Sequence, residues 1–254
     1  MQYTARVSRA ADWAQQWHSG YNPVLPPDCR ALKILALETS TELCSAALWL
    51  DGKVDAREVV AGQRNSELLL PMVDALLAAN KLAARDLNGI AFGAGPGAFT
   101  GVRIACGVAQ GIAFGIDVPV AGIGTLLALA EASGADRAVC CLDARMGEVY
   151  HAAYEKRGAD FVEVHAPGLY KPEAVPDLPA GQWAGCGSGF AVYRRELAAR
   201  YVGSVGRIIE NLSPHAREIA VLAAKRFARG ETLDAAVATP LYVRNKVALR
   251  VDER

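Results

Sequence analysis

The chain has 254 residues, enough for one large domain or two small ones, and its 52% hydrophobic and 21% charged residues are typical of a soluble globular protein. Its 27 basic and 27 acidic residues give a formal net charge of zero, which argues against strong unaided binding to nucleic acid. Six cysteines without a C-x-x-C pair favour free buried thiols in a reducing compartment over structural zinc.

Residues 1–30 are predicted to be an N-terminal extension, because Pro23, Pro26 and Pro27 separate them from the patterned sequence after them. They lack the continuous apolar core of a signal peptide. No stretch approaches the ~18 uninterrupted apolar residues of a membrane span. We therefore expect a cytoplasmic protein that does not contact a membrane.

From Leu32 onward, apolar runs alternate with helical patterns. Strands are predicted at LKILALETS, in the hairpin SAALWLDGKVDAREVV with its turn at Asp51–Gly52, at LNGIAFGAG and at VPVAGIG. Helices are predicted at SELLLPMVDALLAAN with Ser66 as N-cap, from Thr100 to about Gly115, and at TLLALAEAS.

The second half repeats the pattern of the first but not its residues. Strands are predicted at RAVCCLDAR, at GEVYHAAYEKRG as its hairpin partner and at QWAGCGSGF, helices at FAVYRRELAAR and PHAREIAVLAAKRFARG, and a short extended segment at ATPLYVRN. Because each half opens with a hairpin, the sequence predicts an α/β architecture in two related lobes. We assign residues 31–128 to the first lobe and 129–254 to the second, with the option that a C-terminal helix packs back on the first.

The glycine-rich stretch AFGAGPGAFTGVR lies between a predicted strand and a predicted helix, where phosphate-binding loops occur. It does not match the P-loop pattern G-x-x-x-x-G-K-[ST], and residues 82–155 contain no lysine. Gly93, Gly95 and Gly97 alternate instead of following the dinucleotide pattern G-x-G-x-x-G. Phosphate binding and close packing of the backbone therefore both stay open for this loop.

The next predicted helix carries Gly107, Gly111 and Gly115 at a spacing of four, on one face with Arg103. Glycine in a helix interior costs about 1 kcal/mol relative to alanine, so three of them need a physical reason. Without a Cβ atom, another element can approach the helix backbone closely. That element is either part of this chain or part of another protein.

Candidate catalytic groups are sparse. The four histidines show neither H-x-x-x-H nor H-E-x-x-H spacing, so no helical zinc site is predicted. Asp143 with Glu148, and Glu38 with Glu42, flank turns and could bind Mg²⁺ or act as acid and base. Carboxylates at turns are more often solvated.

Several ordered motifs together resemble the TsaB (YeaZ) family over residues 32–245. They are ILALETSTELCSAAL, RNSELLLPMVDALL, GAGPGAFTGVRIACGVAQGIAFG, VPVAGIGTLLALA, DARMGEVYHAAY and PLYVRN. The resemblance implies a two-lobed actin/hexokinase-like (ASKHA) fold, each lobe a mixed sheet with flanking helices. It also implies a role in placing threonylcarbamoyladenosine next to the anticodon of tRNA.

In that system, as the resemblance implies, TsaC makes a carbamoyl-adenylate, TsaD transfers the threonylcarbamoyl group and TsaE is an ATPase partner. A TsaB-like protein is then the non-catalytic partner of its paralogue TsaD in a heterodimer, forms a homodimer when alone, and meets tRNA only indirectly. TsaD-like proteins carry two metal-binding histidines on the helix that reads GTLLALAEAS here, which has none. We therefore expect no catalytic residue and no metal site.

The resemblance places the pairing surface on the predicted helices at 66–80 and 100–115. The residues expected to contact the partner are Leu69, Met72, Val73, Leu76, Arg103, Cys106, Gly107, Gln110 and Gly111. No tightly bound cofactor is expected, although ATP or ADP at the partner interface could lie near Thr39, Ser40, Gly95 and Gly97. The alternative is a stand-alone nucleotide-binding enzyme or a glycoprotease-like metallopeptidase, with a site built from the same loop together with Glu38, or from Asp143.

Overall fold

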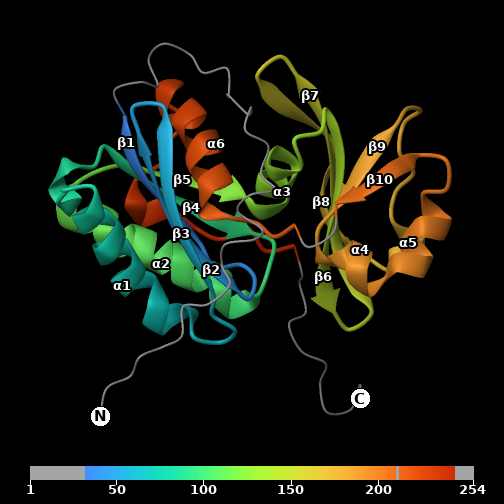
Figure 1. Cartoon of the computed structure of the whole chain (residues 1–254), viewed down its shortest axis with the longest axis horizontal. Coiled ribbons are helices and arrows are strands. Elements are labelled where there is room, and N and C mark those ends of the chain that lie inside the picture. Colours follow the sequence, from blue (N-terminus) through green and yellow to red (C-terminus); the bar gives the residue numbers. More distant parts are fainter. Residues whose placement is uncertain (1–31, 210–211, 244–254) are drawn as a thin grey trace.

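The computed structural model describes residues 32–209 and 212–243. The extension predicted for residues 1–30, and the last two residues of the segment ATPLYVRN, lie outside the described residues. The described chain forms two lobes side by side, each built on one five-stranded sheet (Figure 1).

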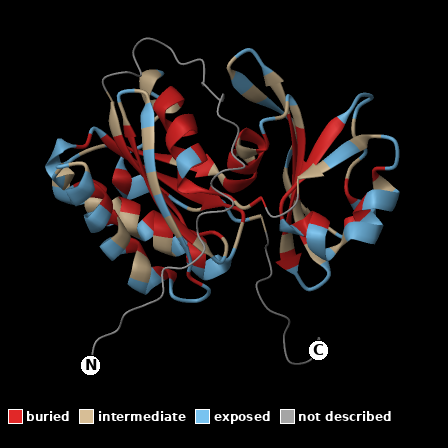
Figure 2. Ribbon diagram, in the orientation of Figure 1, coloured by how far each residue is buried: buried red, intermediate tan, exposed pale blue. Residues whose placement is uncertain are grey.

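The first sheet has the strand order β3-β2-β1-β4-β5. Its strands are β1 (Lys33–Glu38), β2 (Leu43–Leu50), β3 (Lys53–Val60), β4 (Gly89–Gly95) and β5 (Val120–Gly124). β1 to β3 form an antiparallel meander, and β1, β4 and β5 run parallel. β1 and β4 are almost entirely buried because helices cover both faces of the sheet, which explains their continuous apolar sequences (Figure 2).

Two long helices, α1 (Asn65–Ala79) and α2 (Phe99–Ile116), cover one face of this sheet. α2 has the length and mean hydropathy, 1.4, of a candidate membrane span, and its inner face packs on the sheet as a core helix would. Neither helix begins as predicted: the N-cap residues are Arg64 and Ala98, without a side-chain capping bond, in place of Ser66 and Thr100.

The other face is covered by α6 (Ala216–Ala228), from the end of the chain. Its residues Ile219 and Ala223 are fully buried in one cluster with Ile34 and Trp49 of the first sheet. Figure 1 shows α6 in red beside the blue strands. The first lobe is therefore completed by a segment that comes after the second lobe in sequence. α3 (Thr125–Ser133) lies between α6 and the second sheet.

The second sheet has the order β10-β9-β6-β7-β8. Its strands are β6 (Arg137–Arg145), β7 (Glu148–Arg157), β8 (Asp160–Tyr170), β9 (Trp183–Cys186) and β10 (Val205–Ile209). β6 to β8 form an antiparallel meander, and β6, β9 and β10 run parallel. This is the topology of the first sheet again, which confirms the predicted pair of related α/β lobes with an actin/hexokinase-like plan.

Some elements of the second lobe differ from the prediction. β8 and β10 were not predicted, and the helix predicted at FAVYRRELAAR is divided at Tyr193 into α4 (Ser188–Val192) and α5 (Arg194–Arg200). Short 3-10 turns η2 (Ala84–Asp86), η3 (Pro172–Ala174) and η4 (Ala235–Val237) occupy connections. Residues 239–243 form no strand.

Candidate partner surface and interlobe cleft

The glycine-rich loop after β4 packs on the turn that joins β1 to β2. The backbone N–H of Ala98 donates to the carbonyl of Ser40 at 2.7 Å, and Thr39 Oγ1 donates to the carbonyl of Gly101 at 2.7 Å. A Cβ atom at Gly101 would lie 1.9 Å from the Thr39 carbonyl oxygen, and one at Gly97 would lie 2.6 Å from that of Ser40. Close approach of two segments of one chain therefore explains these two glycines.

The four residues predicted to lie near a nucleotide do not all reach the same surface. Ser40 and Gly97 line the cleft between the lobes, whereas Thr39 is fully buried with its hydroxyl bonded to Gly101. Gly95 is buried too, with φ at +105°. The amide of Ala98, which a phosphate loop would offer to its ligand, is used by Ser40.

The interlobe cleft has a volume of about 1200 Å³. It is lined from the first lobe by residues 40–42 and 96–102, and from the second by residues 142–146. Asp143 lies in this wall, and its carboxylate already has partners within the chain. It forms an ion pair with Arg145 at 3.0 Å and accepts a hydrogen bond from the Tyr193 hydroxyl at 3.1 Å.

Glu38 lies outside the lining of this cleft, fully buried at the end of β1. Burial raises the pKa of its carboxyl, and hydrogen bonds from Ser40 oppose this shift. A Cβ atom at Gly93 would lie 1.8 Å from Glu38 Oε2, so the carboxyl occupies the space that the glycine leaves. Of the four carboxylates considered for catalysis, Glu38 is thus a buried group and Asp143 an ion-paired one. Within the described residues, no three His, Cys, Asp or Glu side chains form a group that could hold a metal ion.

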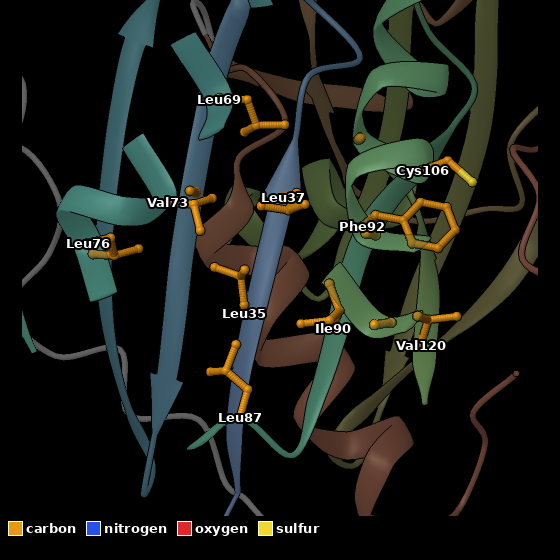
Figure 3. Packing of buried hydrophobic residues seen from close by; sticks show 14 of the residues in the cluster. Leu35, Leu37, Leu69, Val73, Leu76, Leu87, Ile90, Phe92, Cys106 and Val120 are labelled. Carbon is orange, nitrogen blue, oxygen red and sulfur yellow. The ribbon is translucent and has the colours of Figure 1, made fainter. Parts of the chain in front are cut away.

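On α1, the side chains predicted to contact a partner instead point into the first lobe. Leu69, Val73 and Leu76 are buried and pack toward Leu35 and Leu37 of β1 (Figure 3). A buried side chain cannot contact a partner, so this part of the prediction is wrong. The helical spacing identified the apolar face correctly, but that face belongs to the core.

Of the remaining α1 residues, Met72 is half-buried against the same cluster. The outward face of α1 carries Leu70, whose side chain is 47% exposed. Leu70 was not among the predicted contacts. It follows the buried Leu69 in sequence, and consecutive residues of a helix lie on different faces.

On α2, the glycine stripe faces outward. Gly107, Gly111 and Gly115 are exposed, and a Cβ atom at any of them would meet nothing within 4 Å. No element of the described chain therefore uses the close approach that these glycines permit. Phe114, seven positions after Gly107, lies on the same side of the helix and is 61% exposed.

The three other α2 residues predicted to contact a partner have partners within the chain. Cys106 is 3% exposed, and Figure 3 shows it among core residues, so its prediction as an interface residue is wrong. Gln110 Nε2 donates to the carbonyls of Ala235 and Ala238 at 2.9 and 3.2 Å. The Arg103 guanidinium lies 3.2 Å from the ring centroid of Phe99 and 4.7 Å from that of Tyr242.

Comparison with known proteins places this arrangement in a family. Residues 59–250 match the model of the family described as TsaD, tRNA N6-adenosine threonylcarbamoyltransferase. The tRNA threonylcarbamoyladenosine biosynthesis protein TsaB of Escherichia coli K12 is 37% identical over 85% of this chain and 96% of its own length. The TsaB of Haemophilus influenzae is 36% identical over 85% of this chain and 95% of its own length. The chain belongs to the TsaB (YeaZ) family.

Solved structures agree with this membership. YeaZ from Pseudomonas aeruginosa is 38% identical, with a TM-score of 0.77 over 83% of this chain and 99% of that chain. A second Pseudomonas aeruginosa structure, described as similar to peptidase YEAZ, has a TM-score of 0.78 over 84% of this chain and 100% of its own. The TsaB-family fold accordingly spans most of this chain.

Proposed function

We propose that this TsaB-family chain is the non-catalytic partner of a TsaD-like threonylcarbamoyltransferase and is required to place threonylcarbamoyladenosine next to the anticodon of tRNA. The names of its relatives support the pathway. The observation that carries the partner role is the exposed stripe of Gly107, Gly111 and Gly115. Gly107 and Gly111, in the interior of the helix, each weaken α2 by about 1 kcal/mol relative to alanine. No contact within the described chain explains these glycines. Close packing of another protein against the backbone of α2 would explain them.

The side chains of α3 and the carboxylates of Glu38 and Asp143 fit a subunit that is not the catalyst. α3 reads TLLALAEAS and offers no histidine where TsaD-like proteins hold their metal. Glu38 is buried and Asp143 is paired with Arg145, which supports the partner role over the stand-alone enzyme or the peptidase.

A TsaE-like ATPase joins the complex, a homodimer forms in the absence of TsaD, and tRNA is met through TsaD. ATP or ADP binds no more than weakly, at the partner interface and near Ser40 and Gly97 at the edge of the cleft. The protein acts in the cytoplasm.

The test is formation of threonylcarbamoyladenosine on tRNA by purified TsaC, TsaD and TsaE from the same source, with and without this chain. We expect product only when the chain is present. Gly111→Leu adds a side chain to the open stripe, so it should weaken binding to TsaD and product formation at least tenfold. Ala198→Leu, on the exposed face of α5 in the second lobe, is the matched control and should behave as wild type. Equal product with and without the chain would refute the proposal.

A further inference from the structure

The segment after α6 is bound along α2 mainly through its backbone, and we call residues 233–243 the strap. Leu233 exchanges two backbone hydrogen bonds with Val120 at the edge of the first sheet, at 2.8 and 2.9 Å. Two strap carbonyls accept hydrogen bonds from Gln110, and the amide of Leu241 donates to the carbonyl of Ala94 at 2.7 Å. Ala235 and Ala238 are buried in the core of the first lobe.

These contacts place the strap beside the glycine stripe. Gln110 comes three positions after Gly107 and four before Phe114, so the three residues are neighbours on the helix surface. The strap therefore lies along one side of the exposed face of α2.

The strap also presents apolar side chains of its own. Val237 is 61% exposed, and the half-exposed Tyr242 lies against Phe99 with ring centroids 6.4 Å apart. Val237 stands between Ala235 and Ala238, the two residues whose carbonyls Gln110 holds. The exposed apolar surface of α2 thus continues onto a different part of the chain.

We propose that the TsaD-like partner binds the strap and the glycine stripe of α2 as one surface. This inference rests on the proposed function and names a further part of its interface. The partner has the same kind of fold, since the TsaD family model matches residues 59–250, a range that includes α1, α2 and the strap. Such a partner presents a helix of its own. This helix packs closely against the glycines of α2 and contacts Val237 of the strap at its side.

The first experiment measures binding of the full-length chain to purified TsaD by calorimetry. Val237→Asp places a charge on the strap without entering the core, and we expect the Kd to rise at least tenfold. Val202→Asp is the matched control: it is 81% exposed, lies just after α5 in the second lobe, and should leave the Kd unchanged. Equal thermal unfolding of the two variants checks that both fold.

The second experiment uses Cys106, whose Sγ lies 3.7 Å from the Ala238 carbonyl oxygen beneath the strap. Its alkylation by iodoacetamide, measured by peptide mass spectrometry, reports how often the strap lifts. TsaD should slow alkylation of Cys106 in the wild-type chain at least tenfold, while the rate at Cys140 in the second lobe stays constant. An unchanged or faster rate at Cys106 would overturn the proposal.

The outcomes separate this inference from the function on which it rests. If Gly111→Leu weakens binding and Val237→Asp does not, the strap is not part of the interface and only this inference fails. If TsaD does not bind the wild-type chain, or product forms equally without it, the proposed function fails and the inference fails with it. Tenfold weakening by both variants supports both.

Discussion

In both lobes, a glycine-containing segment packs closely against the backbone of a neighbouring part of the sheet. In the first lobe, the segment after β4 approaches the end of β1 so closely that a Cβ atom at Gly101 would lie 1.9 Å from the Thr39 carbonyl oxygen. In the second lobe, the segment after β9 approaches β6, and a Cβ atom at Gly187 would lie 2.4 Å from the Cys141 carbonyl oxygen. These are equivalent places in the repeated topology. Close packing that both lobes share therefore explains the glycine-rich segments without any ligand.

The lobes differ in the helices that come after those segments. The first lobe continues into α2 with 18 residues beside α1 with 15, whereas the second has α4 with 5 residues, α5 with 7, and the short turn η3 where α1 would stand. Prolines 167, 172, 176 and 179 explain why no long helix forms at η3. Within the described residues, a long helical surface is thus a property of the first lobe alone.

The largest effect should come from filling the first-lobe close approach. Gly101→Ala puts a methyl group where the Thr39 carbonyl stands, so the helix must shift and the hydrogen bond from Thr39 Oγ1 is lost. We expect the free energy of unfolding to fall by about 3 kcal/mol, the upper part of the range for overpacking. Urea unfolding measures it, with exposed Gly115→Ala as the control. A loss below about 0.5 kcal/mol would mean that the loop and the turn are not tightly packed.

Much of this comparison could be predicted from the sequence. The hairpin-led pattern in both halves predicted the two lobes, because alternation of apolar runs and turns survives without residue identity. β8 was missed because DFVEVHAPGLY, half-exposed at a sheet edge, lacks a continuous apolar run. The short β10 was missed for a related reason: its sequence VGRII has only a weak apolar pattern.

The partner surface was predicted less well than the fold, for a physical reason. Apolar spacing on α1 shows which residues share a face, but a core face and an interface are both apolar. Leu69 and Val73 therefore could not be separated from true surface positions without the sheet beneath them. The strap contacts of Gln110 and Arg103 join residues more than 120 positions apart, which no local pattern encodes.

An intermediate effect should come from a buried histidine in the second lobe. His151 is fully buried with Nε2 2.8 Å from the Tyr201 hydroxyl, and burial lowers its pKa from 6.5 to about 3. As the pH falls below 6.5 the unfolded chain takes up the proton first, so stability is complete above pH 6.5 and declines as the pH falls toward 3. At pH 5 this loss should be about 2 kcal/mol.

The measurement is urea unfolding of the wild type and His151→Phe at pH 7.5 and pH 5. The phenyl ring keeps the contacts with Tyr170 and Tyr201 but cannot be protonated. The wild type should lose about 2 kcal/mol more than the variant between the two pH values. Equal losses would show that His151 is protonated in the folded protein and that the second lobe does not exclude the charge.

The smallest effect, and the one of opposite sign, should come from Gly107→Ala, six positions from Gly101 in the same helix. Here a Cβ atom meets nothing within 4 Å, so the methyl group costs no contact and restricts the unfolded chain. We expect the free energy of unfolding to rise by about 1 kcal/mol. Urea unfolding should be measured at several low protein concentrations, because self-association would stabilise the wild type as concentration rises.

A gain in stability that comes with weaker TsaD binding would mean that the stripe is kept for a partner at the expense of the helix. A loss of stability that persists on dilution would mean that the stripe packs within its own chain, and the contrast between Gly101 and Gly107 would disappear.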